Sequence, residues 1–421
     1  MQSSIKLRLT VMNFLQFAVW GAYLTSMGRY LGTAGFGSEI GNFYAMQGLV
    51  SLFMPALMGI VADRWIPAQR LLGVCHMLAG MLMLGVFLYT QTDAPSYPSL
   101  FALYSLSVAF YMPTLALSNS VAYTSLDQAG LDLVKSFPPI RVFGTVGFIC
   151  TMIAVSLLGL EATSGQFAVS AIISLVLAVY AQTLPNCPTA PKGQSKSLVE
   201  ALGLRAFVLF KQRKMALFFI FSMLLGVSLQ ITNGFANPFI STFGEIPAYA
   251  DTFGVKYANI LISLSQLSET LCILLIPFAL RRFGIRRVML IAMVAWVLRF
   301  ALLGLGNPGS GVWLFLLSMI VYGVAFDFFN VSGSLFVDKE TDPSIRSSAQ
   351  GLFMIMTNGI GATLGSLGAQ AVINHFVHTE HDTTAILAGW SMSWYVFAAY
   401  AAVVAVLFAV LFRYNTATEA K

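Results

Sequence analysis

One carboxylate lies inside a long apolar stretch of this sequence. The run from Leu314 to Val337 reads LFLLSMIVYGVAFDFFNVSGSLFV, and Asp327 is its only formal charge. An ionisable side chain at membrane depth costs roughly 2.5–3.5 kcal/mol on insertion scales unless it faces protein or water. Asp327 is therefore a candidate proton or ligand site, and the alternative is a structural acid that pairs inside a helix bundle.

Short polar faces occur in several other apolar stretches. Side chains three or four positions apart share one face of a helix. The stretch FPPIRVFGTVGF opens with two prolines, which suit a helix start, and carries one such face. Similar faces lie in SLQITNGFAN, SLSQLSETLCIL and VYGVAFDFFN. Ten polar or aromatic candidates for binding lie on these faces, namely Arg141, Thr145, Phe148, Gln230, Asn233, Gln266, Glu269, Tyr322, Phe326 and Asp327, and the stretch SSAQGLFMIMTNGIGATLG supplies Gln350 and Asn358 in addition.

The residue types in this set indicate what it binds. A carboxamide presents a donor and an acceptor side by side, which suits a nucleobase edge or vicinal sugar hydroxyls. Phe148, Phe326 and Tyr322 offer faces on which a planar ring can stack. One arginine near these residues is too few for a phosphorylated substrate. A neutral, ring-bearing, polyhydroxylated solute fits best, whereas any single amide is equally well explained as a bond between helices.

Two acids suit proton coupling. Desolvation favours the neutral carboxylic acid, and a nearby arginine favours the carboxylate. Asp327 or Glu269 could alternate between such environments during a transport cycle, and we expect an Arg141–Asp327 contact that forms and breaks. Arg299, in another apolar stretch, is expected to pair at a helix interface or to extend its charge to the membrane surface.

The composition indicates a membrane protein. Of 421 residues 57% are hydrophobic and 10% charged, whereas soluble domains carry about 25% charged residues. Apolar runs long enough to span a bilayer recur along the chain, and we see no nucleophile–base motif, so we expect no enzyme. The predicted spans are 9–31, 40–62, 71–90, 100–124, 140–160, 166–184, 215–241, 257–279, 288–305, 312–337, 347–373 and 390–412.

A polar, proline-rich break divides the twelve predicted helices into two sets of six. We expect an all-α membrane fold with an N-terminal half at 1–184, a cytoplasmic linker at 185–214 and a C-terminal half at 215–421. The linker stretch SLVEALGLRAFVLFKQRK is amphipathic enough to lie on the membrane surface. Transporters built from two such halves bind their substrate near the bilayer midplane between them.

Lysine and arginine predict the orientation. Nearly all of them fall on one side if both termini are cytoplasmic, with Arg29 and Lys256 on the other side. The net charge of +6 reflects this bias and requires no nucleic-acid partner. The partners we expect are the lipid bilayer, a solute and protons, for a chain that acts as a monomer.

A short loop carries candidate gating residues. The stretch GIVADRWIPAQR places Gly59 four residues before Asp63, where a glycine would let a neighbouring helix come close. Asp63 and Arg64 at the membrane boundary could lock one helix end against another in one conformation. The pattern resembles the G-x-x-x-D-R loop of the major facilitator superfamily.

We expect no metal and no cofactor. Cys75, Cys150, Cys187 and Cys272 lack metal spacing and are expected to be packing thiols. The stretch HFVHTEHD contains His375, His378 and His381, which could approach one another on a helix. A solvated loop is the expectation there, with a metal site as the alternative.

Several of these stretches together resemble one family. FPPIRVFGTVGF, FSMLLGVSLQITN, SQLSETLCIL, SMIVYGVAFDFFNVSGSLFV and SSAQGLFM, in this order, look like the nucleoside:proton symporter family of the major facilitator superfamily. The resemblance covers essentially the whole chain. It implies an inner-membrane carrier that imports purine and pyrimidine nucleosides, xanthosine among the candidates, with protons. It also implies that the ten binding residues above line the substrate site.

Two other functions stay open from the residues alone. A sugar or oligosaccharide symporter would also use aromatic stacking and amides. A nutrient-sensing membrane receptor would bind the solute without transporting it.

Overall fold

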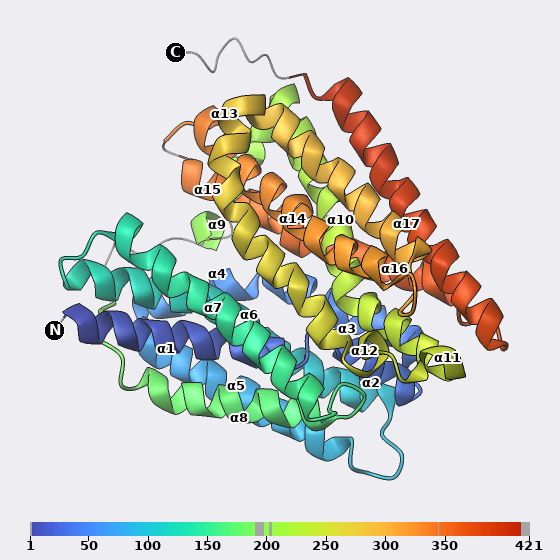
Figure 1. Cartoon of the computed structure of the whole chain (residues 1–421). Helices are drawn as coiled ribbons and strands as arrows, with labels where there is room; N and C mark the ends of the chain where they lie inside the picture. The colour runs from blue at the N-terminus through green and yellow to red at the C-terminus, as the bar shows by residue number, and fades with distance from the viewer. Residues whose placement is uncertain (1, 190–197, 202–203, 344, 414–421) are drawn as a thin grey trace. The chain divides into compact units, whose positions relative to one another are not determined.

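A computed structural model describes residues 2–189, 198–201, 204–343 and 345–413, and all regular structure in these ranges is helical (Figure 1). The α-helices are α1 (Gln2–Gly21), α2 (Met27–Thr33), α3 (Ile40–Ser51), α4 (Met54–Arg64), α5 (Ala68–Tyr89), α6 (Tyr97–Gln128), α7 (Leu133–Leu157), α8 (Gly165–Ala181), α9 (Leu198–Ala201), α10 (Arg213–Thr242), α11 (Pro247–Ala250), α12 (Phe253–Lys256), α13 (Ala258–Leu305), α14 (Val312–Glu340), α15 (Arg346–Met354), α16 (Ala362–Phe376) and α17 (Thr383–Leu411). Short 3₁₀ turns are η1 (Gly37–Glu39), η2 (Leu204–Lys211) and η3 (Phe243–Glu245), and η4 (Ile355–Gly361) is a π-helical turn.

The helices account for the twelve predicted spans. Nine helices in the described ranges are long and apolar enough to cross a membrane. One of them, α13, contains two predicted spans, because Gly284 interrupts it with a φ of 73° that only glycine adopts readily. The predicted span 9–31 falls on α1 and α2, and the predicted span 166–184 falls on the shorter apolar helix α8. The all-helical membrane fold is thus confirmed.

The start of the fifth span was predicted wrongly. Helix α7 begins at Leu133, so Pro138 and Pro139 lie inside it rather than at its first turn. Both prolines are exposed, and a proline inside a helix removes one backbone hydrogen bond from it. The sequence pattern marks where the strongly apolar stretch begins, but the helix extends beyond it toward the polar loop.

The predicted amphipathic linker segment is helical only in short pieces. In the described part of the linker, α9 and the 3₁₀ turn η2 replace one continuous helix, and residues 190–197 and 202–203 lie outside the described residues. Ala206 and Leu209 are buried, while Phe207 and Val208 are exposed. Side chains three apart align on a 3₁₀ helix, so the buried pair forms one face of η2.

The chain forms two compact units. The first comprises Met1–Tyr30 and Leu49–Leu202, and the second comprises Leu31–Gly48 and Gly203–Lys421. The boundary therefore does not follow chain order, because the first part of the second predicted span, as far as Gly48, groups with the second unit. The halves predicted at 1–184 and 215–421 stay a prediction.

Close backbone contacts hold each unit together. In the first unit α1 packs on α7, and a Cβ built on Gly147 would lie 2.1 Å from the carbonyl oxygen of Phe14. In the second unit α10 packs on η4 and α16, and a Cβ on Gly365 would lie 2.1 Å from the carbonyl oxygen of Val227. Lipid tails provide no hydrophobic drive between helices, so small residues that allow such approach stabilise the bundle.

This packing yields a stability prediction. We expect Gly365→Ala to lower the free energy of unfolding by about 1–3 kcal/mol, because the added methyl group must displace the α10 backbone. The matched control is Gly368→Ala on the same helix, where a Cβ meets nothing within 4 Å. The control should be neutral or stabilising by up to about 1 kcal/mol. Thermal unfolding in detergent tests both, and equal stability of the two variants would contradict the packing argument.

Candidate functional site

Helix α14 carries Asp327 in the interior of the second unit. The side chain is 4% exposed, and its Oδ2 atom is buried without a hydrogen-bond partner among the described residues. A buried oxygen without a donor is costly if the group is ionised. A bound proton or a ligand donor would relieve that cost, as expected of a functional acid.

A second acid lies close to it on α13. Glu269 is half-buried, and it is near enough for its charge to act on both Asp327 and Tyr322. The helices touch directly at this level, since a Cβ on Gly323 would lie 2.5 Å from the carbonyl oxygen of Ser268. Ser268 also donates a hydrogen bond from its hydroxyl to the carbonyl of Ile320. The structure therefore brings together the two acids that the sequence predicted to act in proton coupling.

Tyr322 and Phe326 lie next to the acids, but the contacts of their rings differ from the predicted ones. Their rings stack on each other, with centroids 5.6 Å apart and planes 11° apart. Tyr322 is 5% exposed, and Trp296 meets it edge-on at 5.9 Å. The expectation that both rings offer open faces is wrong for Tyr322 in this conformation. Phe326 is half-buried and is the more accessible of the pair.

The predicted amides form two kinds of contact. On α10 the Nδ2 of Asn233 donates to Oε1 of Gln230 at 2.9 Å, so these two form one polar pair. On α13 the Oε1 of Gln266 is buried without a hydrogen-bond partner among the described residues. Gln350 instead bonds to Ser334 of α14, with Nε2 donating to the backbone carbonyl at 2.8 Å, which is the helix-to-helix role.

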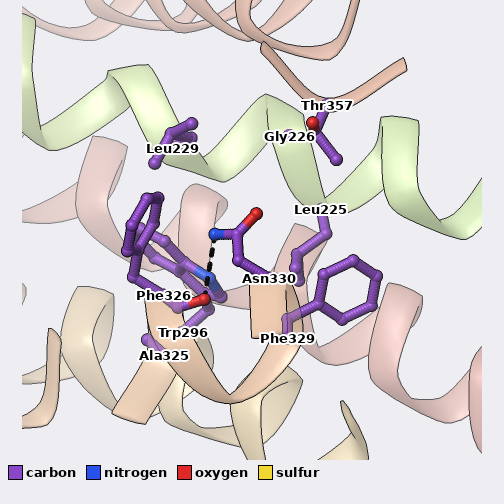
Figure 2. Close-up of a pocket in the computed structure, with 9 residues that line it drawn as sticks. All are labelled: Leu225, Gly226, Leu229, Trp296, Ala325, Phe326, Phe329, Asn330 and Thr357. Carbon is purple, nitrogen blue, oxygen red and sulfur yellow. Dashed lines mark hydrogen bonds between the residues drawn. The ribbon is translucent and has the colours of Figure 1, made fainter. Parts of the chain in front are cut away.

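A small cavity lies beside this site in the second unit (Figure 2). Phe326, Phe329 and Asn330 line it from α14, and Trp296 lines it from α13. The Nδ2 of Asn330 donates to the carbonyl of Phe326 at 3.0 Å, as the dashed line in Figure 2 shows. The volume of this cavity is about 10 Å³, which is room for roughly one water molecule and far less than a nucleoside needs.

The other predicted binding residues lie in the first unit, on α7. The guanidinium of Arg141 lies 4.0 Å from the ring centroid of Phe17 on α1. Phe148 is 7% exposed, and Trp20 of α1 meets its ring edge-on at 6.4 Å, so the expectation of an open ring face is wrong for Phe148 too in this conformation. Thr145 is half-buried between them on the helix. Arg141, Thr145 and Phe148 thus lie on one side of α7, as predicted. Their aromatic partners come from α1, which spacing along α7 could not reveal.

Sequence reasoning missed a buried network behind this face. His76 of α5 is fully buried, and its Nε2 lies 2.8 Å from Oε1 of Gln16. Its Nδ1 lies 2.9 Å from the hydroxyl of Ser174. The Nε2 of Gln16 donates to Thr114 at 2.7 Å. A histidine inside an apolar span was the available signal, because such a residue needs polar partners.

Arg299 of α13 was only partly predicted. It is 2% exposed, so the alternative that it extends its charge to the membrane surface is wrong. Its Nη1 donates to the carbonyl of Ser318 on α14 at 2.8 Å, which confirms the helix interface. Its guanidinium also lies 4.5 Å from the ring centroid of Tyr322, a contact that the sequence did not indicate.

The candidate gating residues lie at the end of α4. Gly59 has nothing within 4 Å of a built Cβ, so the predicted close approach of a neighbouring helix is wrong for this conformation. Asp63 is half-buried and Arg64 is exposed. Their gating role stays a prediction.

The histidine-rich stretch contains no metal cluster. The part of the chain that the structure describes holds no group of three or more His, Cys, Asp or Glu side chains suited to a metal ion. The ring of His378 instead packs on Gly37, whose built Cβ would lie 2.9 Å from Cε1. Burial lowers the pKa of His378, and a bond to the Gly37 backbone and the charge of Glu39 oppose this effect.

Comparisons with known proteins agree with this architecture. The family model described as "Nucleoside H+ symporter" matches residues 3–417 of this chain. Xanthosine permease of Escherichia coli (strain K12) is 50% identical over 98% of this chain and 97% of its own length. The nucleoside permease NupG of the same organism is 46% identical over 98% of this chain and 97% of its own length.

Solved structures show the same fold. A crystal structure of a variant of the nucleoside transporter NupG is 44% identical with a TM-score of 0.91, and the match covers 97% of this chain and 100% of that one. A POT-family peptide transporter, only 12% identical, still has a TM-score of 0.69 over 97% of this chain and 95% of that one, which shows the fold alone. The relatives are permeases rather than enzymes, as predicted. This chain, with paired acids between two neighbouring membrane helices, belongs to the nucleoside H⁺ symporter family.

Proposed function

We propose that this chain imports nucleosides across the bacterial inner membrane together with protons, by alternating access between its predicted halves. Its family and its similarity to a xanthosine permease and a nucleoside permease support this function. The observation that carries it in the structure is the acid pair on α13 and α14. Glu269 acts on Asp327 there, and one Asp327 oxygen lacks a donor among the described residues.

The acid pair supports proton coupling. Two ionised carboxylates at close range repel, so such a pair favours holding at least one proton. A substrate that brings donors to the site, or an arginine that approaches it, would favour release of that proton. Arg141 of α7, which packs over the ring of Phe17 on α1, is the arginine we propose for this role. Asp327 and Glu269 are both candidates for the coupled proton.

The ten predicted residues are the proposed binding site. Gln230 and Asn233 present a paired amide edge, Gln266 presents an unsatisfied carbonyl oxygen, and Phe326 presents the more accessible ring. These groups suit the edge and the face of a nucleobase. We propose that both purine and pyrimidine nucleosides are accepted, with xanthosine among them, and that the monomer is the transporting unit.

One contact within the second unit supports alternating access. The backbone N–H of Gly41 donates to Oε1 of Gln370 on α16 at 2.6 Å, and Nε2 of Gln370 donates to the carbonyl of Gly37 at 3.1 Å. Asn374 donates to the carbonyl of Ser38 at 3.3 Å. We propose that this contact closes the outer side of the transporter. The lysine and arginine residues that are predicted on the opposite side of the membrane from this contact support cytoplasmic termini.

Removing the acids tests the coupling. We expect Asp327→Asn or Glu269→Gln to abolish proton-driven accumulation, because the variant cannot take up and release the coupled proton. One charge moved through about 100 mV is worth about 2.3 kcal/mol, so the wild type can reach roughly 40-fold accumulation. The measurement is uridine uptake into proteoliposomes with an imposed proton gradient, beside exchange without a gradient.

The matched control is Asp338→Asn on the same helix, where the exposed carboxylate pairs with Arg346 at 3.2 Å. This variant should accumulate substrate as the wild type does. Full accumulation by Asp327→Asn would remove Asp327 as the coupling acid, and the same result for Glu269→Gln would remove Glu269.

A competition panel tests the substrate class. We expect unlabelled purine and pyrimidine nucleosides, xanthosine included, to reduce labelled uridine uptake, whereas monosaccharides and oligosaccharides do not. A protonophore should collapse accumulation. Competition by sugars alone would favour the sugar symporter, and binding without uptake by purified protein in vesicles would favour the receptor.

Blocking the outer contact tests alternating access. A Cβ on Gly41 would lie 2.5 Å from the carbonyl of Ser366, so Gly41→Leu should hold this contact open and reduce uptake at least tenfold. The control is Gly32→Leu, where a Cβ meets nothing within 4 Å. Opening is read from thiol labelling of Ser38→Cys in a Cys150→Ser background, because Cys150 is the exposed one of the four cysteines. Unchanged labelling and uptake in Gly41→Leu would refute this gate.

A further inference from the structure

Exposed arginines gather where α13 turns and where α17 ends. The turn of α13 reads ALRRFGIRRVM, and its helix is interrupted at Gly284. We call four exposed residues of this region the arginine cluster, namely Arg281, Arg282, Arg287 and Arg413. Among the described residues none of the four forms an ion pair.

The turn of α13 is held to the end of α17. Nη2 of Arg286 donates to the carbonyl of Ala409 at 2.7 Å. Ala409 lies in the last turn of α17, where backbone carbonyls have no partner within their own helix. Gly284 and Ile285 at the turn are buried. This bond therefore brings Arg413, which follows α17, to the same end of the second unit as the turn.

The helices that carry the cluster offer no acid to balance it. Glu269 is the one acid within α13, and it lies roughly 18 Å from the turn along a helix that rises 1.5 Å per residue. Helix α17 contains no acid. The acids at the end of α14 have other partners, since Asp338 pairs with Arg346 and Glu340 pairs with Lys214. The cluster is thus a positive patch that calls for an anionic partner.

The side chains next to the cluster show where this patch lies. Phe278 and Phe283 of α13 are exposed, and so are Val410 and Leu411 of α17. Both helices are long and apolar enough to cross a membrane, so their exposed apolar side chains contact acyl chains. Arginines directly beyond such a surface extend their charges to the depth of the lipid headgroups.

We infer that the arginine cluster binds the phosphodiester headgroup of an anionic phospholipid whose acyl chains pack along α13 and α17. A planar guanidinium can donate two parallel hydrogen bonds to one phosphate, which an ammonium cannot. Basic pockets between membrane helices bind anionic headgroups in this way. The inference goes beyond the proposed transport function and does not depend on it.

The test is lipid retention by the purified full-length chain in detergent, measured by native mass spectrometry with phosphatidylglycerol or phosphatidylcholine. We expect the wild type to prefer phosphatidylglycerol about tenfold or more, because each arginine near an anionic headgroup contributes a factor of about five. The combined variant Arg282→Gln, Arg287→Gln and Arg413→Gln should lose this preference. The same three residues changed to lysine should keep most of it. Arg281 is left in place because its Nε donates to the carbonyl of Pro277 at 3.2 Å.

The matched control removes three exposed positive charges elsewhere in the second unit. It combines Lys211→Gln, Arg213→Gln and Lys339→Gln, at residues that form no ion pair among those described. The control has the same net charge as the glutamine variant of the cluster and should prefer phosphatidylglycerol as the wild type does. Thermal unfolding gives a second measurement, since a bound lipid raises Tm. Phosphatidylglycerol should raise the Tm of the wild type and of the control, but not that of the glutamine variant.

Each outcome decides the inference. Equal retention of the two lipids by the wild type overturns it, whether or not any variant folds. An unchanged preference in the glutamine variant, or an equal loss in the control, overturns it as well, because the effect would then not belong to the cluster. Displacement of phosphatidylglycerol by inorganic phosphate, but not by chloride at equal ionic strength, would assign the cluster to a free anion instead of a lipid.

Discussion

Ionisable groups in the apolar interior of a membrane protein need neighbours that satisfy or balance them. In this chain that constraint centres on the packing of α13 against α14, where Gly323 lets the two backbones meet beside Ser268. The contact brings Glu269 close enough to Asp327 for the charge of one to act on the other. Without this helix contact the two acids would be isolated charges on separate helices, and the protonation of one would not affect the other.

Both units use arginine in a similar way. In the first unit Arg141 lies over Phe17, and in the second Arg299 lies over Tyr322. A guanidinium is weakly hydrated and planar, so it can pack on a ring where an ammonium would need water. In each unit this places a permanent positive charge beside residues that we propose to bind substrate or protons. Arg141 belongs to the proposed binding site, whereas Arg299 lies outside it.

Much of the fold was predictable because its signals are local. Runs of apolar residues predict membrane helices from length alone, and spacings of three and four predict shared faces such as Gln230 with Asn233, which indeed bond to each other. The errors arose where a local pattern has several structural outcomes. Two prolines suit a helix start but lie inside α7, and Gly59 suits a close helix contact but meets no neighbour.

The sequence by itself determined the helical membrane architecture, the residue types of the site and the presence of two acids at depth. These follow from composition and periodicity, which do not depend on what lies across the bundle. Only the tertiary structure decided that Tyr322 is covered, that Gln350 links helices and that Arg299 stacks on Tyr322. Such contacts join helices whose relative rotation and depth are fixed by packing, so no spacing along a single helix could reveal them.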